Sequence, residues 1–201
     1  MTSWPFGSLS RGTYQVVLAD PPWRFATYSE AGQQKCPTYN TMTTPDIALL
    51  PVADLAARHC LLLMWTTTTH LEDALWVMMQ WGFGYVGAGF WHKKTAGGKT
   101  ALGTGYWWRG AGEFLLLGKR GNPPCPRKFI SNVIESFDTG VLETTRGRHS
   151  EKPEEIQDLV DGLAPLAIKC ELFARRHRPG WECWGDQLPE VRLQGSEGDK
   201  S

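Results

Sequence analysis

Short apolar runs alternate along the chain with stretches whose apolar residues recur at helical spacing. The short runs predict buried strands, and the periodic stretches predict amphipathic helices. Strands are expected at Tyr14–Ala19, Cys60–Trp65, Tyr85–Trp91, Glu113–Leu117, Lys169–Ala174 and Trp181–Trp184, while residues 133–141 are left open. Strands that alternate with helices predict an α/β fold, with a sheet that carries helices on both faces.

Helices are predicted in the intervals between these strands. Residues 44–57 have helical character but are interrupted by Pro51. Thr69 and Glu72 have the spacing of a capping box, which predicts the start of a second helix that Gly82 ends. Pro153 is expected at the first position of a third helix, where its missing N–H costs nothing. The predicted apolar stripes are Leu71, Ala74, Leu75 and Met78 in the second helix and Ile156, Leu159, Val160 and Leu163 in the third.

Two polar, glycine-containing stretches, 25–44 and 92–112, are predicted to be long loops. Loops of this length within a domain are commonly functional. The chain has 201 residues, which is the size of one domain with a sizeable core. We expect residues 1–194 to form this domain and residues 195–201 to be a frayed tail.

Charge and composition narrow the class of protein further. The 21 basic and 21 acidic residues cancel, so net charge alone does not indicate a nucleic-acid partner. Basic residues nevertheless cluster, for example at 92–94 and 175–178. Five cysteines without a CxxC pair argue against a disulfide framework or a zinc site, so no metal is expected. No apolar run suits a membrane span and no signal peptide is found, which favours the cytoplasm.

The tetrapeptide Asp20-Pro21-Pro22-Trp23 follows directly on the first predicted strand. Two prolines remove two N–H donors, so the carbonyls of Asp20 and Pro21 are expected to face outward beside the Asp20 carboxylate. This acceptor surface suits a planar molecule with an NH₂ group, whose developing positive charge the acceptors would stabilise. Trp23 is expected to offer a face for stacking on a base. The alternative is structural: a turn that contains a core tryptophan.

The segment "VVLADPPWRF" resembles catalytic motif IV of the amino-methyltransferases, in the form found in the MT-A70 family. Other segments that resemble the family follow in its order, and together they span roughly residues 4–190. They are "YNTM", "LLLMW", "WGF", "FWHKK", "GTGYWWR", "EFLLLGKRGNP", "HSEKPEEIQDLV" and "KCELFARRHRPGWECWGDQL". The resemblance implies a Rossmann-like class I methyltransferase fold with permuted motif order, the catalytic motif preceding the cofactor region. It also implies S-adenosylmethionine (SAM) as the methyl donor.

The resemblance further implies roles for individual residues. The catalytic residues would be Asp20, Pro21, Pro22 and Trp23. The cofactor would be bound by Asp20, Glu171, Arg175, His177, Asp186, Gln187 and, as a cover over its adenine, Phe6. The substrate would be held by Trp23, Tyr39, Lys93, Lys94, Trp107 and Arg109. A lysine of the eukaryotic pattern is Gly112 here, which leaves its contact with the SAM carboxylate to Arg175 or His177.

The expected reaction is direct transfer of a methyl group from SAM to the N6 amine of adenine in nucleic acid. The resemblance to bacterial and phage enzymes favours DNA, and a base in duplex DNA would have to be flipped out. RNA adenosine and, less in keeping with the motif, cytosine N4 are alternative targets. A non-catalytic nucleic-acid-binding subunit is an alternative of a different class. A homodimer is also expected from family likeness.

Overall fold

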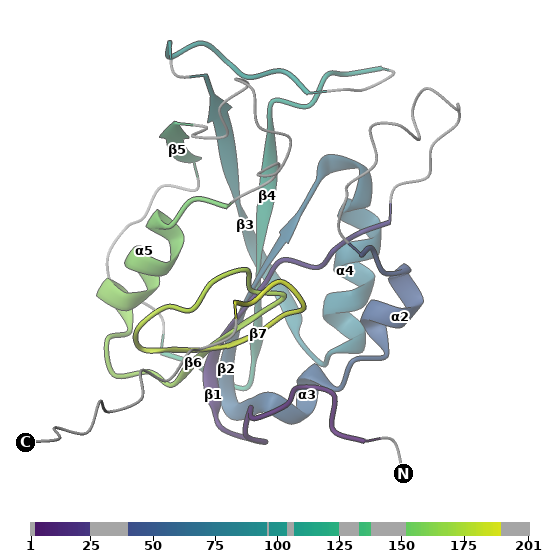
Figure 1. Ribbon diagram of the computed structural model, residues 1–201, viewed down its shortest axis with the longest axis vertical. Coiled ribbons are helices and arrows are strands. Elements are labelled where there is room, and N and C mark those ends of the chain that lie inside the picture. The colour runs from purple at the N-terminus through teal and green to yellow at the C-terminus, as the bar shows by residue number, and fades with distance from the viewer. Residues whose placement is uncertain are drawn as a thin grey trace, which may run out of the picture.

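The predicted strands lie in one sheet in the computed structural model (Figure 1). The structure describes residues 3–24, 40–95, 97–103, 107–124, 133–137 and 152–189. Within these residues the sheet has seven strands in the order β5-β3-β4-β2-β1-β6-β7. The strands are β1 (Tyr14–Ala19), β2 (Ala56–Thr66), β3 (Gly84–Lys94), β4 (Gly112–Arg120), β5 (Val133–Phe137), β6 (Lys169–Leu172) and β7 (Trp181–Trp184). The predicted α/β sheet is thereby confirmed.

Several strand ends were predicted wrongly. β2 begins at Ala56 rather than Cys60, and β6 ends at Leu172 rather than Ala174. β3 and β4 are both longer than predicted. Residues 92–94 belong to β3 rather than to the following loop, and residues 118–120 belong to β4 rather than to a turn. The antiparallel pairing explains both extensions, because it runs from Gly84 opposite Lys119 to His92 opposite Gly112. Backbone pairing thus carries polar residues into the sheet where side-chain polarity alone indicated a loop.

Strand direction brings several chain segments to one edge of the sheet. β1 runs parallel to β2 and to β6, whereas β4 runs antiparallel to β2 and β3. Ala19, the last residue of β1, therefore lies opposite Met64 of β2 and Leu172 of β6. The carboxyl ends of β1, β2, β3 and β6 and the start of β4 share this edge (Figure 1).

The helices lie in the predicted intervals. They are α2 (Thr44–Ala48), α3 (Val52–Leu55), α4 (Leu71–Gln80) and α5 (Glu155–Leu163), with a 3-10 turn at Thr68–His70. However, α4 and α5 begin later than predicted, and residues 56–57 belong to β2 instead of a helix. The break at Pro51 is confirmed. The capping box is wrong, because the 3-10 turn makes His70 the cap of α4, with no side-chain capping bond. Pro153 precedes α5, which is capped by Glu154. No helix in the described part of the chain is long and apolar enough to span a membrane.

Helices cover both faces of the sheet, as predicted: α2, α3 and α4 pack on one face and α5 on the other (Figure 1). Alternate residues of β1 belong to the two hydrophobic cores on the opposite faces of the sheet. Val17 and Ala19 belong to the core beneath α2–α4, and Val16 and Leu18 belong to the core beneath α5. The predicted stripe of α5 needs one correction, since Leu159 is exposed whereas Gln157 is buried.

Candidate active site

Asp20 stands at the carboxyl end of β1, where the strand leaves the sheet. Its backbone N–H donates to the Leu172 carbonyl of β6 at 3.4 Å, which ties the residue to the neighbouring strand. β2, the strand that follows β1 in the chain, lies on one side of β1, whereas β6 and β7 lie on its other side. The order of the strands therefore reverses at β1. In open α/β sheets ligands bind in the crevice at such a point of reversal, beyond the carboxyl ends of the strands.

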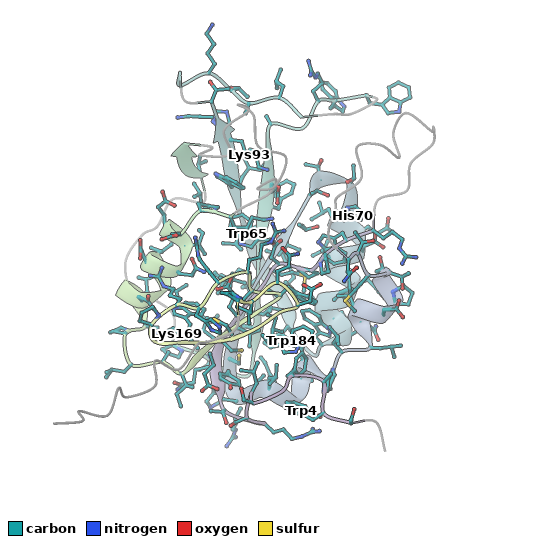
Figure 2. The ribbon with its side chains drawn as sticks, in the orientation of Figure 1. Trp4, Trp65, His70, Lys93, Lys169 and Trp184 are labelled. Carbon is teal, nitrogen blue, oxygen red and sulfur yellow. The ribbon has the colours of Figure 1, made fainter. Side chains whose placement is uncertain are left out.

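The Asp20 carboxylate is held by a lysine that precedes α5. Lys152 Nζ lies 2.9 Å from Asp20 Oδ1 and 3.1 Å from Glu113 Oε2, so one ammonium bridges two carboxylates. Lys93 of β3 pairs with the other oxygen of Glu113 at 2.7 Å. We call these side chains (Asp20, Lys152, Glu113 and Lys93) the charge network. Figure 2 labels Lys93 at this end of the sheet.

Opposite charges in the network keep its buried members ionised. The side chains of Lys152 and Glu113 are only 14% and 9% exposed, so burial works against both charges. Burial would lower the pKa of Lys152, but Asp20 and Glu113 outweigh it and raise the pKa to about 12. Burial would also raise the pKa of Glu113, but Lys152 and Lys93 outweigh it and hold that pKa below its ordinary value.

A cleft opens beside Asp20 between β1, β6 and the start of α5. Its lining combines acceptors, cations and apolar surface, from Leu18, Asp20, Trp65, Lys152, Pro153, Gln157, Glu171, Phe173, Arg175 and Arg176. Gln157 Nε2 donates to Glu171 Oε2 at 2.8 Å, which orients this carboxylate. Burial raises the pKa of Glu171. Such a lining suits a ligand that carries ammonium, carboxylate and hydroxyl groups together.

One of the two carbonyls predicted to face outward, that of Pro21, is engaged within the segment. The Pro21 carbonyl accepts a hydrogen bond from the Trp23 N–H at 2.9 Å. The Pro22 carbonyl accepts one from the Met42 N–H, also at 2.9 Å. The outward Pro21 carbonyl was therefore a wrong prediction: the nearest N–H after the prolines folds back onto it. The Asp20 carboxylate, by contrast, belongs to a residue that lines the cleft, where Lys152 holds it.

Trp23 lies in the core instead of presenting an open face. Its side chain is 4% exposed, and its indole N–H donates to the Trp65 carbonyl at 3.3 Å. Its ring stacks on His70, with centroids 5.8 Å apart and an interplanar angle of 16°. The structural alternative, a turn that contains a core tryptophan, describes this ring correctly. Figure 2 labels both Trp65 and His70.

The predicted cofactor residues fall into two groups. Asp20, Glu171 and Arg175 line the same cleft. His177 is exposed and its Nε2 contacts the Pro189 carbonyl at 3.1 Å, away from that lining. The remaining predicted cofactor residues also lie outside it: Asp186 and Gln187 are exposed, and Phe6 is buried at 1% exposure between Trp4 and Trp184. Phe6 belongs to the hydrophobic core, and its role as a cover over the adenine of the cofactor stays a prediction.

The predicted substrate residues are likewise divided. Lys93 is engaged by Glu113 in the charge network, so it is not the loop lysine that we expected. Lys94 is the last residue of β3 and is half-buried. Trp107 is 95% exposed, and the exposed Arg109 donates from Nε to the Gly103 carbonyl at 3.1 Å. Tyr39 lies outside the described residues.

Sequence reasoning missed Lys152 and Glu113. Lys152 does carry a local signal: it directly precedes Pro153 at the start of a predicted helix, where a cation opposes the helix dipole. A lysine in that position therefore suggests that a carboxylate elsewhere in the chain compensates its unfavourable interaction with the helix dipole. Glu113 was assigned to a buried strand, and a carboxylate there requires a cation. Neither signal identifies the partner, since the paired residues are 20 or more positions apart in the chain.

An ammonium shared by two carboxylates lies beside a cleft at the point where the α/β sheet reverses. This arrangement indicates a binding site for a polar small molecule. The chain belongs to the MT-A70 family, whose model matches residues 14–187. It is therefore a member of a methyltransferase family, as the resemblance implied.

Individual relatives agree with this assignment. The type II methyltransferase M.MunI of Mycoplasma sp is 30% identical, over 94% of this chain and 84% of its own length. The N(6)-adenosine-methyltransferase MT-A70-like protein of Arabidopsis thaliana is 33% identical over 90% of this chain. The N(6)-adenosine-methyltransferase catalytic subunit METTL3 of Homo sapiens is 29% identical over 90% of this chain. The chain spans only 25% and 29% of the lengths of these last two proteins.

Proposed function

We propose that the chain transfers a methyl group from SAM to the exocyclic N6 amine of adenine in nucleic acid. The observation that carries the proposal is the Asp20 carboxylate, which is held at the reversal point of the sheet in an MT-A70 chain. DNA is the favoured polymer, because M.MunI is a relative that the chain matches over most of both lengths.

In this reaction Asp20 acts as a hydrogen-bond acceptor for the amine. The amine nitrogen of adenine is a poor nucleophile, because its lone pair is delocalised into the ring. An acceptor on one of its hydrogens favours a more pyramidal nitrogen and stabilises the positive charge that develops as the N–C bond forms. The methyl–sulfur bond breaks as that bond forms, and the nitrogen then loses one proton to water. Lys152 acts through Asp20 as a positioning residue, since it contacts both carboxylate oxygens, at 2.9 and 3.0 Å.

The cleft residues fit the methyl donor. SAM supplies an electrophilic methyl group together with an ammonium, a carboxylate and ribose hydroxyls. Glu171, fixed by Gln157, offers an acceptor to the hydroxyl or ammonium groups. Arg175 and Arg176 offer cations to the carboxylate from the same lining. Asp20 also lines the cleft, so the donor would lie next to the acceptor that receives the amine.

Nucleoside mass spectrometry tests this function without knowledge of a recognition sequence. Unmethylated DNA and RNA would be incubated separately with the protein and deuteromethyl-SAM, digested and examined for labelled N6-methyladenine. Label in DNA and not in RNA is the expected result. Label confined to RNA would move the proposal to RNA adenosine, and label on cytosine would contradict it.

A catalytic role must also be separated from that of a non-catalytic subunit. Calorimetric titration with SAM, and the same labelling with Asp20→Asn, make that distinction. Binding of SAM by the wild-type protein, with label that disappears in the variant, supports an enzyme. Failure of the wild-type protein to bind SAM would refute it. The cytoplasmic location and the homodimer stay predictions, which fractionation of cells and analytical ultracentrifugation test.

A further inference from the structure

Two neighbouring tryptophans stand almost fully in solvent on the segment that joins β3 to β4. Trp107 is 95% exposed and Trp108 is 89% exposed. Other tryptophans of the chain, such as Trp65, Trp81 and Trp91, are 1–2% exposed. Exposing two adjacent indole rings is unfavourable in water, so the pair indicates a surface that a ligand or partner covers.

The segment is anchored at the edge that carries the charge network. β3 ends and β4 begins at the edge where β1 ends at Ala19, and Glu113 is the second residue of β4. The Gly103 N–H donates to the Gly110 carbonyl at 2.7 Å, and Arg109 Nε donates to the Gly103 carbonyl at 3.1 Å. These bonds tie Gly103 to Arg109 and Gly110, which directly follow the two exposed rings in the chain.

The charge around the pair has one sign. Residues 92–112 contain four basic residues (Lys93, Lys94, Lys99 and Arg109) and no acidic residue. Lys93 is bound to Glu113, whereas Lys99 and Arg109 are exposed on the same loop as the rings. Aromatic faces interleaved with cations are the combination that binds bases and backbone phosphates of single-stranded nucleic acid together.

We propose that Trp107 and Trp108 are a stacking platform for unpaired nucleobases next to the target adenine. The inference rests on the proposed function and deepens it, since it gives the site a contact with neighbouring bases. Arg109 and Lys99 bind the phosphates of the same strand. When a target adenine is flipped out of a duplex, neighbouring bases lose their stacking, which costs free energy. The platform offers these bases new stacking partners.

Binding is measured with two probes, an oligothymidine of about 20 nucleotides and an abasic oligomer of the same length. This length exceeds the ~4–16 nucleotides that one OB-fold domain covers. The pair of probes distinguishes base stacking from charge attraction. Both probes carry the same phosphates, but only the first has bases. Affinities are measured by fluorescence anisotropy with labelled probes, for the full-length wild-type chain and for Trp107→Ala/Trp108→Ala. Trp107→Phe/Trp108→Phe keeps aromatic faces. Trp76→Ala is the matched control, since Trp76 is 40% exposed on α4.

The double alanine variant is expected to lose about tenfold or more in affinity for oligothymidine, as loss of base stacking predicts. Its affinity for the abasic oligomer stays unchanged, the phenylalanine variant recovers most of the loss, and Trp76→Ala binds like the wild type. Equal losses on both probes, or no loss on either, overturn the proposal. So does unchanged binding with a shift from dimer to monomer in analytical ultracentrifugation, which would make the pair an interface between copies.

Oligothymidine contains no adenine, so this assay is independent of methyl transfer. If the wild-type protein stacks on thymidine but labels no adenine, the proposed function fails and the stacking platform stands. If it labels adenine and the alanine variant binds both probes normally, the platform fails and the proposed function stands.

Discussion

Replacing Lys152 with methionine removes the ammonium from the middle of the charge network. Methionine keeps the volume and length of the apolar stem, so packing is largely preserved while the charge is lost. The substitution breaks the contacts with Asp20 at 2.9 Å and Glu113 at 3.1 Å. Glu113 retains Lys93 at 2.7 Å, so Asp20 is the carboxylate that loses its cation.

The size of the effect follows from burial. Removing one partner of a buried ion pair costs about 3–5 kcal/mol, because an uncompensated charge stays behind. Asp20 is 21% exposed, which partly solvates it and places the expected loss at the low end, near 3 kcal/mol. For a chain of 201 residues this corresponds to a fall in Tm of roughly 6–12 °C. Lys119→Met, which removes an exposed lysine of β4, is the control and should leave Tm unchanged.

The pH of the measurement decides how much of this loss is seen. The native pKa of Glu113 is below its ordinary 4.5, so its contribution is present above pH 4.5 and disappears as pH falls through the native value. The native pKa of Lys152 is about 12, so its contribution is complete below its ordinary 10.5 and disappears as pH rises through 12. Urea unfolding near pH 8 therefore measures the full effect, and the gap between variant and wild type should shrink in acid.

A double-mutant cycle tests whether the loss comes from the stranded carboxylate. Lys152→Met/Asp20→Asn removes both charges, so it should be about 1–2 kcal/mol more stable than Lys152→Met alone, within the range of measured couplings. Equal stability of Lys152→Met and wild type at pH 8 would refute the reasoning, since the network would then contribute nothing. An additive double variant would show that Asp20 and Lys152 do not act on each other.

Three further predictions concern Asp20, Trp23 and Cys60. Asp20→Asn should lower kcat for methyl transfer by about 10²–10³, because it removes one charge-stabilising acceptor. Its Tm should fall less than that of Lys152→Met, because Lys152 keeps its contact with Glu113. Single-turnover assays and thermal unfolding measure the two effects. Trp23→Ala should cost about 3–5 kcal/mol in unfolding free energy, since the ring is 4% exposed, and Trp23→Phe clearly less; urea titration measures both. Burial raises the pKa of Cys60 to about 12, so its thiol should not react with iodoacetamide at pH 8 in the folded protein. Peptide mass spectrometry should detect alkylated Cys60 only after urea unfolds the chain.

The strand β1 was predictable because it is a short apolar run covered on both faces. Val16 to Ala19 illustrate this, since alternate residues enter different cores and all of them are apolar. The ends of β3 and β4 were not predictable in this way. His92 and Lys94 are polar residues that the sheet takes in because β4 and β5 pair with their backbone. Pairing of this kind depends on partners elsewhere in the chain, which local polarity does not report.

The site was predictable as far as it follows from one strand end. A carboxylate directly after β1 must lie at the carboxyl edge of the sheet, so the position of Asp20 followed from the pattern. The orientation of Trp23 did not follow, because it depends on His70 and the Trp65 carbonyl, which come from another part of the chain. The same sequence Asp-Pro-Pro-Trp is compatible with an exposed ring and with a buried one.

The charge network supports the proposed role of Asp20 as an acceptor and argues against a role as a nucleophile or metal ligand. Its four side chains come from the end of β1, the end of β3, the start of β4 and the segment before α5, so the network closes only when the sheet is complete. Two carboxylates and two ammonium groups leave it without net charge. Lys152 already neutralises Asp20, which makes the carboxylate a poor site for a further cation but leaves its lone pairs open to an N–H donor. An adenine amine offers such a donor and develops its positive charge only during the reaction, when a fixed carboxylate stabilises it most.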